Sequence, residues 1–286
     1  MQTATRRGEG RKEGREAGSA LVSADWLEAH LDDPAVLVVE VDVAATRHEE
    51  WHIDGAVLWN VYEDLKDPQY RLNEAPEIER LLCRSGITPE SIVVFYGYAP
   101  AMGVWLLELL GHREARVLDC SRDAWLAEGR PWTTAPSIPQ PSAYPLADRR
   151  APIRAVASDV LESIDAEGTV LLDVRTREEY DGERFWPSGG MQPDGRPGHV
   201  PSAVRFDPGD LYDGRGAFRS AEELRHQFAP AMTDDRAVIT YCTIGGRAST
   251  AWFVLTHLLD RHDVRVYDGS WAEWGRTPDV PVAAGT

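Results

Sequence analysis

One short segment combines a cysteine, two glycines and an arginine at a spacing that suits nucleophilic chemistry. An apolar run ends at Tyr241, the loop CTIGGR follows (Cys242 to Arg247), and a helix is predicted to begin near Ala248. A cysteine in such a loop lies at a helix N-terminus, where unpaired N–H groups and the positive end of the helix dipole favour an anion. The pattern therefore predicts that Cys242 reacts as a thiolate.

The rest of the loop is typical of an anion cradle. Gly245 and Gly246 let the backbone curl so that several N–H groups point inward. Such a cradle lowers the pKa of the thiol and suits the outer sulfur of a persulfide, while the Arg247 guanidinium suits a small anionic sulfur donor. The alternative, a buried core cysteine, needs neither the glycines nor the arginine. The substrate-binding residues predicted here are Thr243, Ile244, Gly245, Gly246 and Arg247.

The other two cysteines carry no such context. Cys83 follows two leucines on a predicted helix and Cys120 ends a predicted strand, so both are interpreted as packing residues. The three cysteines form no CxxC pair and no zinc-type cluster, which predicts neither a disulfide framework nor a metal site. Free thiols are typical of a reducing compartment, and we expect a cytoplasmic protein.

The two halves of the chain repeat the same landmarks in the same order. VLVVEVD (36–42) matches VLLDVR (170–175), and WHIDGAV (51–57) matches GHVPSAV (198–204). Buried β-branched runs that alternate with helical segments predict an α/β fold of two domains, each a parallel sheet flanked by helices. In the first half Gly97 stands where Cys242 stands in the second, so the first domain is predicted to be inactive.

Composition shifts predict where the units begin and end. Residues 1–19 are interpreted as a disordered tail, 20–132 as the inactive domain and 153–286 as the catalytic domain. Residues 133–152 are rich in proline, which precludes continuous helix or central strand, and are predicted to form an extended linker along the surface.

The net charge and the hydropathy of the chain limit the classes of partner that it can bind. The net charge is −17 and the pI near 4.9, which disfavours a nucleic-acid partner because binding phosphates requires clustered Lys and Arg. No stretch approaches the roughly 18 apolar residues of a membrane helix, so no membrane partner is expected.

At this point the motifs LLDVRTREEYDGE, GHVPSAV, YCTIGGRAST and VRVYDGSWAEW resemble the successive signatures of the rhodanese family. The resemblance covers residues 21–282, and the sequence is most similar to the tandem-domain thiosulfate sulfurtransferases of actinobacteria. It implies that Cys242 forms a persulfide, that backbone amides from Thr243 through Arg247 cradle its outer sulfur, and that no cofactor is needed. Glu179 occupies a place where some members have a donor-binding arginine, which leaves Arg177 or Arg184 as substitutes.

The implied activity is transfer of sulfur from thiosulfate to cyanide, a thiol or a sulfur-carrier protein, and the residues leave the acceptor open. Phosphatases of the same fold have five residues between cysteine and arginine, whereas four separate Cys242 from Arg247 here. Mercaptopyruvate sulfurtransferases usually carry a CGSGVT-like loop, so 3-mercaptopyruvate is the second donor. A sulfur-relay or sensing protein is a further alternative.

The region 180–198 is rich in glycine and proline and is predicted to be a long loop. It is interpreted either as a plain surface excursion or as a functional loop. In the second case Phe185 or Trp186 would line the entrance and select the acceptor.

Overall fold

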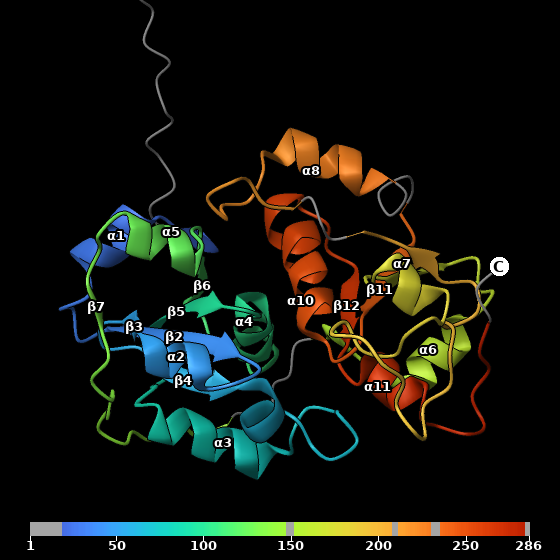
Figure 1. Cartoon of the computed structure of the whole chain (residues 1–286), viewed down its shortest axis with the longest axis horizontal. Helices are drawn as coiled ribbons and strands as arrows, with labels where there is room; N and C mark the ends of the chain where they lie inside the picture. Colours follow the sequence, from blue (N-terminus) through green and yellow to red (C-terminus); the bar gives the residue numbers. More distant parts are fainter. Residues whose placement is uncertain (1–18, 147–151, 208–210, 230–234, 284–286) are drawn as a thin grey trace, which may run out of the picture.

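The computed structural model describes residues 19–146, 152–207, 211–229 and 235–283. Two α/β domains lie side by side, each built on a five-stranded parallel sheet (Figure 1). Both predicted features, the parallel sheets and their helical cover, are confirmed. The predicted tail falls outside the described residues except for Ser19.

The first sheet has the strand order β1-β6-β5-β2-β4. Its elements are β1 (Leu21–Val22), α1 (Ala24–Ala29), β2 (Val36–Asp42), α2 (Thr46–Glu50), β3 (His52–Ile53), β4 (Val57–Asn60), the π-helical turn η1 (Val61–Leu65), α3 (Ala75–Arg84), β5 (Ile92–Gly97), α4 (Pro100–Leu109), β6 (Ala115–Leu118), α5 (Arg122–Ala127) and β7 (Trp132–Thr133). Val38 packs with α1 and α5, and Val39 faces the α3 and α4 side, so β2 is covered on both faces as its apolar run predicts.

The second sheet has the order β8-β12-β11-β9-β10. Its elements are β8 (Arg154–Ala155), α6 (Ala157–Ser163), β9 (Thr169–Asp173), α7 (Arg177–Tyr180), β10 (Val204–Arg205), α8 (Ala221–Gln227), β11 (Ala237–Tyr241), α10 (Gly246–Phe253), η3 (Val254–Leu258), β12 (Val264–Tyr267) and α11 (Ser270–Trp274). Strand for strand this is the order of the first sheet, so the internal repeat read from the sequence is present in the topology.

The repeat extends to buried polar contacts. In the first domain the hydroxyl of Tyr96 accepts from the N–H of Ile53 at 3.1 Å and donates to Glu40 at 2.8 Å. In the second, the hydroxyl of Tyr241 accepts from the N–H of Val200 at 3.2 Å. The same tyrosine thus pins the same loop to the central strand in both halves, because a buried N–H needs a partner.

Helices α4 and α10 pack against each other between the two sheets (Figure 1). Each follows the loop at the end of its central strand, so the two loops also meet: a β-carbon on Gly246 would lie 3.3 Å from that of Ala99. The indole N–H of Trp105 donates to the carbonyl of Ile153 at 3.1 Å and joins the domains at a second point. The loop after β11 is therefore walled on one side by the first domain.

The proline-rich segment follows the first domain. After β7, residues 134–146 form neither helix nor strand, as predicted, and residues 147–151 lie outside the described part of the chain. The N–H of Ser142 donates to the carbonyl of Cys83 at 2.9 Å, and buried Tyr144 stacks on His112.

Serine is a preferred N-cap residue, so the sequence predicts that Ser23 and Ser158 each cap a helix. The Ser23 side chain accepts from the N–H of Trp26 and caps α1, as the sequence predicts. Ser158 was expected to cap the helix that follows β8, and this prediction is wrong: α6 begins at Ala157, after Val156. The carboxylate of Asp159 instead accepts from the N–H of Val156 at 2.8 Å, which satisfies the same end of the helix.

Candidate functional site

Cys242 lies at the carboxyl end of β11, with only 1% of its surface exposed. The N–H of Gly245 donates to the Sγ of Cys242 at 3.2 Å, so the loop curls around the sulfur of its first residue. Gly245 has φ +94°, and a β-carbon there would lie 3.0 Å from the carbonyl oxygen of Asp268. Only glycine fits this turn, because an L side chain would be both strained and crowded.

Hydrogen bonds from α11 hold the cysteine loop in place. The N–H of Trp271 donates to the carbonyl of Cys242 at 3.0 Å, and that of Ala272 to the carbonyl of Thr243 at 2.9 Å. The N–H of Cys242 donates to the hydroxyl of Ser270 at 3.1 Å. These bonds use loop groups that point away from the sulfur. The DGSWAEW motif after β12 therefore positions the cysteine loop.

Glu179 holds the arginine of the loop. Its two carboxylate oxygens accept from Arg247, each at 2.8 Å, and Thr243 Oγ1 donates to it at 2.5 Å. Burial alone would raise the pKa of Glu179, but the hydrogen bonds and charge of Arg247, together with Thr243, lower it to about 2. The guanidinium expected to meet the donor is thus already paired with a buried carboxylate.

The two substitute arginines point elsewhere. Arg177 is 66% exposed and pairs with Asp181 at 3.7 Å on its own helix. Arg184 donates to Glu178 and to the Thr176 hydroxyl, each at 3.1 Å. Among the described contacts, none joins either arginine to the cysteine loop.

Two further motif residues belong to the buried frame. Asp173 and Arg175 form an ion pair at 2.7 Å with both side chains 0% exposed, and the guanidinium lies over the ring of Trp271, 4.4 Å from its centre. His199 stacks on Tyr180 with ring centres 3.6 Å apart. Asp173 and His199 are therefore both held by buried contacts within the second domain.

The first domain also reaches the site. Tyr98 is 52% exposed, and burial of its hydroxyl raises its pKa, which the positive charge of Arg247 opposes and the negative charge of Cys242 reinforces. Lys66, which no sequence motif singled out, has a buried side chain whose Nζ donates to the carbonyl of Asp268 at 2.8 Å. The cysteine loop is therefore bordered by side chains that lie more than a hundred residues away in sequence.

A model of the rhodanese-like domain matches residues 23–128 and again 156–277. The chain belongs to the rhodanese family. Each matched range contains four of the five strands of one sheet, and the cysteine loop is the turn after the central strand of the second sheet.

Curated relatives of this rhodanese are similar over nearly the whole chain. It is 42% identical to the "Putative thiosulfate sulfurtransferase SseA" of Mycobacterium bovis, over 93% of this chain and 91% of that protein. It is 39% identical to the "Sulfur carrier protein TtuD" of Thermus thermophilus, over 93% and 96%. These names place the chain in the sulfurtransferase family, which handles sulfur donors and acceptors.

Solved structures share the fold of this rhodanese. The anaerobic ergothioneine biosynthesis enzyme from Chlorobium limicola, with its substrate trimethyl histidine, superposes with a TM-score of 0.81 at 22% identity, covering 93% of this chain and 70% of that one. The wild-type structure of EanB gives the same TM-score at 21% identity, covering 93% and 69%. At this identity the likeness concerns the fold alone.

The long loop, residues 180–198, belongs to the second domain and contacts the first. Phe185 is buried, whereas Trp186 lies against Tyr70 of the first domain, with ring centres 5.6 Å apart. Arg196 anchors the loop: its guanidinium donates to five main-chain carbonyls, those of Trp274, Gly275, Thr277, Pro278 and Val280. The loop is thus fastened to the C-terminal segment.

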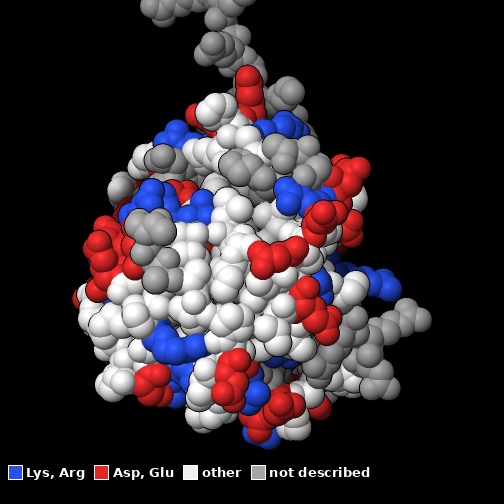
Figure 2. Space-filling model, turned by 90° about the vertical axis from the view of Figure 1, so that its right-hand side faces the viewer, with Lys and Arg blue, Asp and Glu red and all other residues white. Residues whose placement is uncertain are grey.

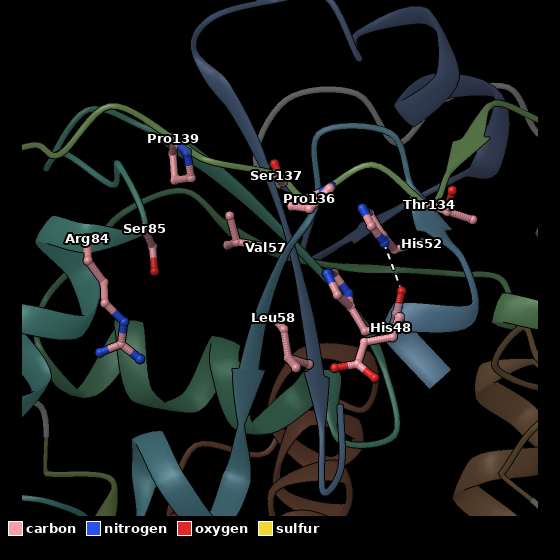
Figure 3. A pocket seen from close by; sticks show the side chains of 11 residues that line it. His48, His52, Val57, Leu58, Arg84, Ser85, Thr134, Pro136, Ser137 and Pro139 are labelled. Atoms are coloured by element: carbon pink, nitrogen blue, oxygen red, sulfur yellow. Dashed lines mark hydrogen bonds between the residues drawn. The ribbon is translucent and has the colours of Figure 1, made fainter. Parts of the chain in front are cut away.

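A separate cavity of about 460 Å³ lies in the first domain, between β4 and the proline-rich segment (Figure 3). Its two histidines, His48 and His52, stack with ring centres 3.9 Å apart, and His52 Nδ1 is bonded to the carbonyl of His48 at 2.8 Å. Tyr180 and His199 make the same stack and the same ring-to-carbonyl bond in the second domain. The histidines of this cavity are therefore part of the repeated frame.

On the face of the second domain seen in Figure 2, acidic and basic side chains alternate around a largely uncharged area. Among the described residues, no helix is long and apolar enough to cross a membrane.

Proposed function

We propose that this protein moves sulfur from thiosulfate to cyanide or a thiol through a persulfide on Cys242. The hydrogen bond from the N–H of Gly245 to Sγ carries the proposal, because a donor aimed at the sulfur favours the thiolate over the thiol. The fixed positive end of α10 acts in the same direction.

The chemistry balances without a cofactor. The Cys242 thiolate attacks the outer sulfur of thiosulfate, a new S–S bond forms, the S–S bond of thiosulfate breaks, and sulfite leaves with its electron pair. Cyanide then attacks the outer sulfur of the persulfide, thiocyanate leaves, and the thiolate is restored. In this proposal the N–H groups of Thr243, Ile244, Gly245, Gly246 and Arg247 cradle the outer sulfur, and the support for it is the N–H of Gly245, which donates to Sγ at 3.2 Å.

Donor recognition is the less direct part of the proposal. Because Arg247 is paired with Glu179, a donor that uses its guanidinium must share or displace that carboxylate. Arg177 and Arg184 remain proposals for the outer end of the donor. 3-Mercaptopyruvate is the alternative donor. A sulfur-relay role is a second candidate function, favoured by the 39% identity with a protein named as a sulfur carrier.

Intact-mass measurement tests the function. After incubation with thiosulfate or 3-mercaptopyruvate we expect a gain of about 32 Da, one sulfur atom, which cyanide reverses as thiocyanate appears. The donor with the faster gain identifies the subclass. The Cys242→Ser variant must show no gain, whereas Cys83→Ser must behave like the unaltered protein. If neither donor adds mass, the proposed activity is wrong.

A further inference from the structure

Lys66 lies between the two domains, on the segment that follows η1. Residues 66 and 72 form an antiparallel bridge, so this segment makes a small hairpin that extends from the first domain toward α11. The side chain of Lys66 is only 1% exposed. A cavity of about 520 Å³, lined by Tyr62, Lys66, Asp67, Pro68 and Tyr70, opens beside it.

Gly245 connects this ammonium group with the sulfur. Its N–H donates to the Sγ of Cys242, and a β-carbon on it would lie only 3.4 Å from Lys66 Nζ. The absence of a side chain at this position therefore leaves the cation in contact with the sulfur loop. Burial lowers the pKa of Lys66, while the negative charges of Asp268 and Cys242 oppose this effect.

The other cations near the loop already have carboxylate partners. Arg247 is bound by both oxygens of Glu179, and Arg154 Nε donates to Asp268 at 2.7 Å. Lys66 also forms an ion pair with Asp268, but its Nζ lies 3.7 Å from the carboxylate, beyond hydrogen-bonding distance, and its one described hydrogen bond goes to a neutral carbonyl.

Two more titratable groups border this cluster. Burial raises the pKa of Glu273, which favours its uncharged form. Burial likewise raises the pKa of Tyr62, which keeps its hydroxyl neutral. Lys66 therefore shares the Asp268 carboxylate with Arg154 and, unlike Arg247 and Arg154, donates no described hydrogen bond to a carboxylate.

The choice of lysine at this position is itself unusual. The chain has 30 basic residues, of which 28 are arginine and only Lys12 and Lys66 are lysine. Lysine is a compact point charge with three rotatable donors, whereas arginine presents a planar fork that selects carboxylates. A compact charge suits a single sulfur atom that changes between thiolate and persulfide.

We propose that Lys66 of the first domain is the counter-charge of Cys242, stabilising its thiolate and the persulfide formed on it. The inference deepens the proposed function and rests on it. The first domain, which has Gly97 at the position of Cys242, thereby contributes a charged group to the reaction of the second.

Carbon NMR of the ammonium-bearing methylene of lysine tests the coupling without altering Lys66. In protein labelled with ¹³C-lysine only Lys12 and Lys66 give signals, and Lys12 serves as the internal reference. The Cys242→Ser variant removes the thiolate, so the pKa of Lys66 should fall by about one unit or more, while that of Lys12 stays constant. An unchanged Lys66 titration in this variant overturns the inference.

The reciprocal measurement is the pH dependence of Cys242 alkylation, read at the Cys242 peptide by mass spectrometry. Because coupling is reciprocal, Lys66→Met should destabilise the Cys242 thiolate and slow alkylation at pH 7 by about tenfold. Arg80→Gln, which removes one exposed charge from the same domain, is the matched control and should not change the rate. Equal rates in folded Lys66→Met and Arg80→Gln also refute the inference.

These outcomes are separate from the fate of the proposed function. Neither the titration nor the alkylation uses thiosulfate. A protein that shows the coupling but gains no sulfur refutes the proposed activity alone, and a protein that gains sulfur without the coupling refutes the role of Lys66. If Lys66→Met does not fold, the NMR comparison of unaltered protein with Cys242→Ser still decides.

Discussion

Replacing Glu179 with glutamine removes the carboxylate that holds Arg247 and Thr243 together. The side chain is 0% exposed and makes a two-pronged pair with the guanidinium at 2.8 Å, so the variant leaves a largely buried cation without its partner. We expect a loss of stability that depends on pH, because the two states of the protein bind the proton of Glu179 differently.

The size of this stability loss follows from the pKa of Glu179. Glu179 falls from 4.5 to about 2 on folding, a difference of about 2.5 units, which corresponds to about 3 kcal/mol of stability at pH 7. A carboxyl whose pKa is lowered in the folded state contributes this stability above pH 4.5 and loses it as the pH falls toward 2. At pH 3 about 1.4 kcal/mol should remain.

Urea unfolding followed by tryptophan fluorescence, at pH 7 and pH 3, measures the difference between Glu179→Gln and the unaltered protein. Glu178→Gln is the matched control, because Glu178 is the neighbouring residue, is 48% exposed and pairs with Arg184 at the surface. The control should stay close to the unaltered protein at both pH values. A Glu179→Gln deficit that is the same at both pH values, or no larger than that of the control, would refute the reasoning.

Two further variants probe the backbone around the site. Gly245→Ala should destabilise the protein by about 1–2 kcal/mol because of its positive φ, and by more because its β-carbon meets Asp268; it should also slow persulfide formation. Gly189→Ala is the control: Gly189 has φ +103° but lies in open space, so this variant has the backbone strain alone and should leave the rate of persulfide formation unchanged. Arg196→Gln should destabilise the protein by about 2 kcal/mol and speed amide hydrogen exchange in residues 275–283. Arg177→Gln is the control and should do neither. Equal exchange rates in the two variants would show that Arg196 does not anchor the loop.

The sequence was sufficient for the fold and for the loop that carries Cys242. The two sheets follow from buried apolar runs whose order is repeated, and a glycine-rich turn between strand and helix is a local pattern. The prediction that Ser158 caps α6 is wrong, because Ser158 and Asp159 are both good capping residues and the sequence does not tell which of them faces the free N–H of Val156.

The charge arrangement around the loop could not be predicted in the same way. The contact between Lys66 and Asp268 spans 202 residues, and that between Glu179 and Arg247 spans 68. Such pairs depend on how two domains pack, which leaves no periodic signal in either segment. The rarity of lysine in the chain was the available hint for Lys66.

Gly97 makes it difficult for the first domain to acquire a reactive cysteine by a single substitution. It occupies the place of Cys242 in the first domain, but with φ +104°, and a β-carbon there would lie 2.9 Å from the carbonyl oxygen of Val41. A single mutation to cysteine would therefore create a strained, crowded side chain rather than a second reactive thiol. A reactive cysteine in the first domain would therefore require a different backbone conformation throughout this turn.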